Sequence, residues 1–268
     1  KGCASAAILM LADGTVFYGR ACGAAGTACG EVCFNTSLEG YFEVLTDPSY
    51  AGQIVTMTYP QIGNYGIDPA DVQSAYPGSA ERGAVTPALR GMIVHDMCHT
   101  PSNWRSSMSV PEYLKNNSIV AVEGIDTRAL VRHLRDHGAQ QGIISTEIFD
   151  LTELAATLAK APALVGENLV KTVGCADEYP YAAADLPAAH AFADAAPAPA
   201  KYRVVVYDCG IKRGGCGIDL VGKGGQLGND TLFVFSGNSG DHGGFCNGAG
   251  EGCICDSGAH YRSTQLRL

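Results

Sequence analysis

The fold of this chain is decided by residues 30–66, which read GEVCFNTSLEGYFEVLTDPSYAGQIVTMTYPQIGNYG. Residues 31–35 and 53–59 have the β-branched and aromatic composition that is typical of strands. Asp47 and Pro48 predict a turn between them, because proline fixes φ and aspartate bonds its own backbone. The stretch therefore predicts two strands that are joined by a structured connection.

A polar shelf ends the first of these strands. It consists of Asn35, Thr36 and Ser37. Short polar side chains of this kind either cap a helix or hold a small polar ligand. For any one of these residues, turn and cap chemistry is the commoner role, so both interpretations stay open at this point.

Capping residues, turn dipeptides and apolar periodicity predict further short elements on either side of this stretch. One helix is capped by Asp126 and stopped by Gly138, with Leu130, Val131 and Leu134 on one face. The predicted elements are a hairpin over 6–19 that turns at Asp13 and Gly14, strands over 91–97, 119–122 and 142–145, and helices over 110–116, 126–137 and 150–161, the last with Leu151, Leu154, Ala155 and Leu158 as its apolar face.

These mixed elements predict an α/β domain over residues 1–173. Residues 174–200 are rich in alanine and proline and lack periodicity, which predicts a linker, with an irregular but ordered segment as the alternative. A second unit is expected over 201–268, where residues 204–207 and 231–235 resemble buried parallel strands. The second of these runs leads into small and glycine-rich residues, as at the carboxyl edge of an α/β sheet.

Two aromatic side chains lead to specific expectations. Trp104 is the only tryptophan. Because a tryptophan buries a large ring while its N–H seeks a partner, we expect Trp104 to anchor its loop. His95 stands alone in a predicted strand, and we expect it to be structural rather than catalytic.

Composition and charge narrow the function classes. The net charge of −9 argues against a nucleic-acid partner, and no apolar run approaches the roughly 18 residues that a membrane span needs. Residues 1–200 carry −10 and residues 201–268 carry +1, so an acidic face of the first domain could meet a basic partner. Eleven cysteines without a C-x-x-C pair argue against zinc and favour free thiols in a reducing compartment.

Three stretches carry a family resemblance: residues 30–66, SNWRS at 102–106, and VAVEGIDTRALVRHLRDHGAQQGII at 120–144. They closely resemble the N-terminal domain of the small subunit of glutamine-dependent carbamoyl phosphate synthetase. The resemblance runs from about residue 8 to 171, resumes at 202–213 and then weakens. It implies an α/β chain: a mixed α/β domain of the small-subunit type, followed by a partial class I glutamine amidotransferase domain with a flavodoxin-like fold.

The resemblance also implies a function. Such a subunit hydrolyses glutamine to glutamate and supplies ammonia to a large subunit, which makes carbamoyl phosphate for pyrimidine and arginine synthesis. No cofactor is expected in this chain, since it lacks a phosphate-binding G-x-x-x-x-G-K-[ST] loop; ATP and Mg are expected on the large subunit. The alternative is a non-catalytic scaffold, or pseudo-glutaminase, that binds a partner through its first domain. The expected compartment is the cytoplasm, or an organelle stroma or matrix if the missing N-terminal Met reflects a removed transit peptide.

Four site residues follow from the resemblance. It places the nucleophile on Cys255, the oxyanion loop on residues 236–241 with Gly240 and Gly237, and a glutamine contact on Ser37. The sequence departs from the family pattern in this region. Gly237 and Asn238 are exchanged, Cys255 lacks its flanking glycines, and no His-x-Glu pair follows it. Three explanations fit these departures: a truncated chain, an uncertain sequence or a degenerate domain. We expect the chain as given to hydrolyse glutamine poorly.

Overall fold

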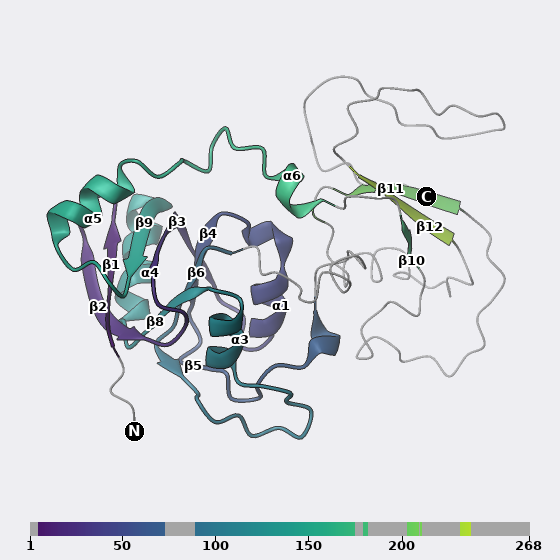
Figure 1. Ribbon diagram of the computed structural model, residues 1–268, viewed down its shortest axis with the longest axis horizontal. Coiled ribbons are helices and arrows are strands. Elements are labelled where there is room, and N and C mark those ends of the chain that lie inside the picture. The colour runs from purple at the N-terminus through teal and green to yellow at the C-terminus, as the bar shows by residue number, and fades with distance from the viewer. Residues whose placement is uncertain are drawn as a thin grey trace. The chain divides into compact units, whose positions relative to one another are not determined.

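A closed barrel of seven strands forms the N-terminal part of the computed structural model, in the order β1-β2-β8-β6-β4-β3-β9 (Figure 1). β3, β4, β6 and β8 are mutually parallel, while β1, β2 and β9 join the barrel in antiparallel pairs. The strands are β1 (Ala6–Leu11), β2 (Val16–Ala21), β3 (Thr27–Asn35), β4 (Gln53–Met57), β6 (Gly91–Ile93), β8 (Val120–Glu123) and β9 (Gln140–Ser145). The structure describes residues 5–72, 89–174, 179–181, 203–208, 210 and 231–236.

The predicted hairpin over residues 6–19 is confirmed as β1 and β2. Met10 pairs with Val16 at the end of the ladder, and Gly14 takes a φ of 86° in the turn, where a side chain would be strained. The side chain of Asp13 accepts a hydrogen bond from the Thr15 N–H at 2.9 Å. Local turn chemistry thus sets the register of the first strand pair.

Side chains of the parallel strands alternate between two cores. Ile54 of β4 and Ile93 of β6 belong to the cluster inside the barrel, whereas Val55 and Met92 belong to the cluster outside it. This alternation is the two-residue period of a strand that is buried on both faces. Both faces of the parallel strands are therefore covered. Side chains inside the barrel cover the inner face, and helices cover the outer face.

Helix α4 (Thr127–His137) packs against the inner cluster. Leu130 and Leu134 are 0% and 3% exposed and lie in that cluster. As predicted, the Asp126 side chain caps the helix by accepting from the Ala129 N–H at 2.9 Å, and Gly138 follows its end with a φ of 89°. Burying two leucines contributes several kcal/mol in all, at about 1.5–3 kcal/mol for each side chain.

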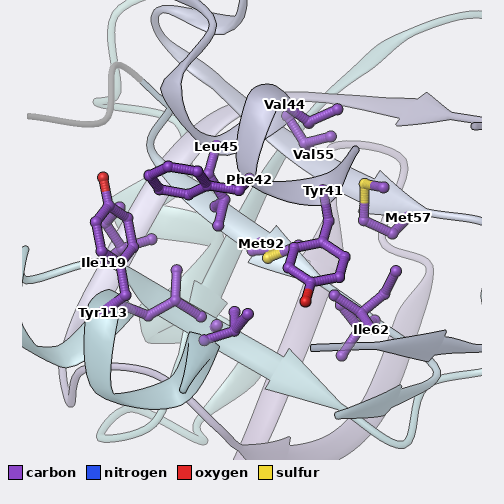
Figure 2. Packing of buried hydrophobic residues seen from close by; sticks show 14 of the residues in the cluster. Tyr41, Phe42, Val44, Leu45, Val55, Met57, Ile62, Met92, Tyr113 and Ile119 are labelled. Carbon is purple, nitrogen blue, oxygen red and sulfur yellow. The ribbon is translucent and has the colours of Figure 1, made fainter. Parts of the chain in front are cut away.

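Helices α1 (Tyr41–Thr46) and α3 (Val110–Asn116) pack on the outer cluster, as Figure 2 shows. Phe42 of α1 meets Tyr113 of α3 edge to face, with ring centroids 5.3 Å apart. Ser109 caps α3 by accepting from the Glu112 N–H at 3.3 Å. The bounds of α3 are those that the sequence predicted. The remaining elements of this part are η1 (Pro48–Tyr50), β5 (Gln61–Ile62), η2 (Pro69–Asp71), β7 (Asp96–Met97), α5 (Leu151–Leu158) and α6 (Val170–Val173).

Several predicted elements differ from the structure. β3 begins at Thr27 rather than at 31, and β4 ends at Met57 rather than at 59. The expected strand over 91–97 is two strands, because β6 ends at Ile93 and β7 pairs with β5 instead. Helix α5 ends at Leu158 rather than at 161, and only Leu154 and Leu158 of its predicted apolar face are buried. Leu151 is 44% exposed because it begins the helix, before the turn that faces β1 and β9.

The expectation for Trp104 was wrong. Its side chain is 92% exposed, so it does not anchor the loop by burial. His95 fits the structural role that was expected, since its Nδ1 lies 3.1 Å from the Ile125 carbonyl oxygen. Among the described residues, no helix combines the length and the apolar character that crossing a bilayer requires.

A second, three-stranded sheet has the order β10-β12-β11. β11 (Arg203–Asp208) and β12 (Thr231–Ser236) are parallel, as the sequence predicted. β10 (Tyr179–Tyr181) pairs with β12 in the antiparallel direction. It lies inside the segment over residues 174–200 that the sequence predicted as a linker, with an irregular but ordered segment as the alternative. The domain boundaries at 173/174 and 200/201 stay predictions.

Candidate functional site

The polar shelf lies at the carboxyl end of β3, where the parallel strand β4 also ends. Asn35 pairs with Met57 across the two strands. The Asn35 amide donates to the Tyr50 hydroxyl at 2.9 Å, and its side-chain oxygen accepts from the Ser37 N–H at 2.8 Å. Asn35 therefore ties the backbone at Ser37 to the turn that contains Tyr50. This is turn chemistry, and it holds Ser37 in a defined position.

A second tyrosine holds the other end of the same segment. The Tyr65 hydroxyl accepts from the N–H groups of Gly40 at 2.7 Å and of Tyr41 at 3.2 Å. Its ring stacks on Tyr41 with centroids 4.1 Å apart. The N-cap of α1, Gly40, has no side-chain cap of its own, so Tyr65 performs the capping that the shelf residues were expected to supply.

Both tyrosines of this stack stay protonated at neutral pH. Burial raises the pKa of Tyr41 far above its usual value, and the neighbouring Tyr65 adds to the rise. Burial also raises the pKa of Tyr65, against the lowering effect of its hydrogen bonds from Gly40 and Tyr41. The Tyr41 hydroxyl donates to the Gly66 carbonyl at 2.8 Å. The pair therefore acts as a neutral hydrogen-bonding clamp.

Ser37 itself is exposed. Its backbone is held by Asn35, while no hydrogen bond of its hydroxyl occurs within the part of the chain that the structure describes. A second exposed serine, Ser49, lies on the neighbouring turn η1, where its N–H donates to the Asp47 side chain at 2.8 Å. Because Tyr50 bonds Asn35, the two serines lie on connected turns. Both hydroxyls are open to a polar ligand.

The other predicted site residues are not brought together with Ser37 by the described structure. Gly237, Gly240 and Cys255 lie outside the described residues. Gly237 directly follows β12, whose last residue is Ser236. The predicted loop therefore begins at the carboxyl end of a parallel strand, where α/β sheets place their sites.

A groove of about 510 Å³ opens at the opposite end of the parallel strands. Gly30, Gly52 and Leu164 are among the residues that line it. Gly52 has a φ of 79°, which an L side chain rarely adopts, so the backbone itself favours a glycine there. Arg90 and Lys160 add positive charge to the lining. Ser37 does not line this groove.

The sequence analysis missed the buried carboxylate of Glu123, which ends β8. It is 4% exposed. Its oxygens lie 3.3 Å from Arg20 Nε and 3.5 Å from His99 Nε2, and one accepts from the Met97 N–H at 3.3 Å. A buried charge needs such partners. The sequence carried no signal for this cluster, because its members are far apart in the chain.

The strands from β1 to β9 and their helices thus form a mixed α/β barrel domain with a clamped polar turn at one end. Residues 9–144, about half of the chain, match the family described as the carbamoyl-phosphate synthase small chain, CPSase domain. The chain belongs to this family.

Individual relatives of this chain carry the name of the same family. The carbamoyl phosphate synthase small chain of Syntrophotalea carbinolica is 52% identical over 207 residues, which are 77% of this chain and 52% of that protein. The protein of the same name from a Synechococcus strain is 52% identical over 168 residues, or 63% of this chain and 40% of that protein. The protein of the same name from a Nostoc strain is 51% identical over 173 residues, which are 65% of this chain and 42% of that protein. The chain spans about half the length of these relatives, or less.

Proposed function

We propose that this protein is the glutaminase subunit of a carbamoyl phosphate synthase. It would release ammonia from glutamine and pass it to a large subunit, which would make carbamoyl phosphate. The observation that carries the proposal is the family match over residues 9–144. The relatives' shared name, small chain, supports a partnership with a larger chain.

In the proposed reaction, the Cys255 thiolate attacks the glutamine carboxamide carbon, and ammonia leaves from the tetrahedral intermediate. Backbone N–H groups near Gly237 and Gly240 would hold the oxyanion. Water then releases glutamate from the thioester. The Ser37 hydroxyl, exposed on a clamped turn, would contact the substrate glutamine.

The large subunit would carry the ATP and Mg chemistry. The first domain is the part of this chain that keeps the family sequence, so we propose that it makes the contact with the large subunit. The cytoplasm, or an organelle stroma or matrix, is the compartment that fits this function. No role for a membrane or a nucleic acid is proposed.

The first test measures ammonia release from glutamine by the protein together with its large chain. It is paired with alkylation by a glutamine-like chloroketone, and mass spectrometry locates the label. Labelling of Cys255 with steady ammonia release is the expected outcome for the complex, whereas the 268-residue chain alone should release ammonia poorly. Binding of the large chain without labelling or ammonia release would contradict the glutaminase proposal and favour the scaffold alternative.

The second test is Ser37→Ala in the active complex. Loss of one hydrogen bond of about 1 kcal/mol raises the glutamine KM about 5-fold with little change in kcat. Melting temperature should not change, because the hydroxyl is exposed. Ser49→Ala is the matched comparison on the neighbouring turn. A rise in KM for Ser49→Ala alone would move the glutamine contact to that turn, and a lower melting temperature with unchanged kinetics for Ser37→Ala would give Ser37 a structural role.

A further inference from the structure

The loop that carries Trp104 is exposed, yet its backbone is held in place. The indole side chain is 92% exposed. On one side of it, the Ser102 N–H donates to the Asn64 carbonyl at 2.9 Å. On the other side, the Ser106 N–H donates to the Asn103 carbonyl at 3.1 Å. A large apolar ring therefore stands in water on a backbone that is bonded on both sides of it.

Side chains fix this loop further. Arg105 Nη2 lies 2.5 Å from a carboxylate oxygen of Asp68 and 3.6 Å from one of Asp71. The Arg105 N–H donates to the Asn103 side chain at 3.1 Å. Because the loop is already ordered, a partner that binds the indole would pay little entropy for ordering it. Tryptophan is also one of the residues that most often dominate the energy of a protein interface.

The surroundings of this loop are acidic. No lysine or arginine occurs from residue 21 to residue 81, a segment that contains Glu39, Glu43, Asp68 and Asp71. Burial raises the pKa of Glu43, and the nearby carboxylates of Asp71 and Glu39 raise it further. In the described ranges, neither Glu39 nor Glu43 forms an ion pair. Arg105 already pairs with Asp68 and Asp71. The carboxylates of Glu39 and Glu43 still repel each other, and a cation from outside would relieve that repulsion.

We propose that Trp104 and the carboxylates of Glu39 and Glu43 form a docking surface, the Trp104 surface, for a partner polypeptide. The partner presents an apolar pocket for the indole, bordered by lysine or arginine side chains. This inference rests on the proposed function, under which the partner is the large chain of the synthase.

Other occupants fit the Trp104 surface less well. A nucleic acid would bring phosphates against carboxylates. A second copy docked with two-fold symmetry would place this acidic surface against itself, since such contacts use the same patch on both subunits. A second copy could instead offer Arg128, Arg132 and Arg135 of α4, but such a head-to-tail contact yields rings or open filaments.

The test compares binding of the large chain by the full 268-residue chain and by its variants. Trp104→Ala is expected to raise the Kd at least about 30-fold, as for a central interface residue. The matched control is Val165→Ala, because Val165 is 91% exposed on a different loop. It should change the Kd less than 2-fold. Circular dichroism melting checks that both variants stay folded.

A second pair of variants tests the charges. The double change Glu39→Gln with Glu43→Gln should lower the association rate at low salt, and the difference should shrink at high salt. The control changes two exposed glutamates elsewhere, Glu147→Gln with Glu167→Gln, and should leave the rate unchanged. A rate that falls equally in both double variants would mean a diffuse field effect and would contradict a local acidic docking surface.

The outcomes separate this inference from the proposed function. If the wild-type chain binds the large chain and Trp104→Ala binds equally well, the docking surface is wrong and the proposed function stands. If the wild-type chain does not bind the large chain at all, the proposed function is wrong, and the large chain is not the partner of the Trp104 surface. If Trp104→Ala instead abolishes self-association of the chain in sedimentation experiments, the occupant is a second copy and the inference is overturned.

Discussion

Tyr65→Phe tests the clamp that holds the segment from Asn35 to Tyr41. The substitution keeps the aromatic ring and therefore the stack on Tyr41 at 4.1 Å. It removes the hydroxyl that accepts from the N–H groups of Gly40 and Tyr41. Gly40 offers no side-chain cap, and the other side chain that meets a first-turn N–H is Glu43, which bonds its own.

The magnitude follows from what is lost. Removing a helix cap costs about 0.5–2 kcal/mol, and one net hydrogen bond contributes about 1 kcal/mol. Tyr65 is half-buried, so water can replace part of the loss. We expect the free energy of unfolding to fall by about 1.5 kcal/mol, which lowers the melting temperature by about 3–6 °C in a domain of this size.

Urea unfolding followed by circular dichroism measures this change. Tyr18→Phe is the matched control, because Tyr18 is 68% exposed on β2, and it should change the free energy of unfolding by less than about 0.5 kcal/mol. Hydrogen exchange adds a local readout, since the Gly40 and Tyr41 amides should exchange faster in Tyr65→Phe. Equal stability of Tyr65→Phe and wild type, with unchanged exchange at these amides, would refute the clamp.

Two further predictions concern other parts of the barrel domain. Trp104 is the only tryptophan and is 92% exposed. The tryptophan fluorescence of the free chain should therefore match that of a tryptophan derivative in water and be fully quenched by acrylamide. A blue-shifted fluorescence that acrylamide does not quench would contradict the exposed loop. Burial raises the pKa of Asp13, but hydrogen bonds from Thr15, Gln140 and His133 outweigh it and hold that pKa well below its usual value. A lowered pKa stabilises the folded state above about pH 4 and loses this effect as the pH falls further. Asp13→Asn should therefore lower the urea midpoint at pH 7, with the difference shrinking toward pH 3. Asp136→Asn, at an exposed position of α4, is the control, and an equal loss at both pH values would contradict the carboxylate's role.

Local elements were predicted well from the sequence because their signals are local. The β1–β2 hairpin needs only a turn dipeptide between two apolar runs, and α4 needs only the Asp126 cap and the Gly138 stop. The family resemblance of residues 30–66 and 120–144 was confirmed by the family match over residues 9–144. Gly237, Gly240 and Cys255 stay predictions that lie outside the described residues.

The errors arose where a residue's environment depends on distant parts of the chain. The run over 91–97 has strand character throughout, but its second half forms β7, which pairs with β5 rather than continuing β6. A three-residue strand within the alanine- and proline-rich segment forms because β12 offers it an edge. Neither partner can be deduced from local composition.

By itself, the sequence determined the family, the positions of most strands and helices, and the caps that begin α4 and α5, since these depend on neighbouring residues. Only the tertiary structure decided that seven strands close into a barrel and that the Tyr65 hydroxyl caps α1. It also decided that Trp104 points into water. The physical reason is that burial and hydrogen-bond partners are properties of the packed chain, which joins residues that the sequence keeps far apart.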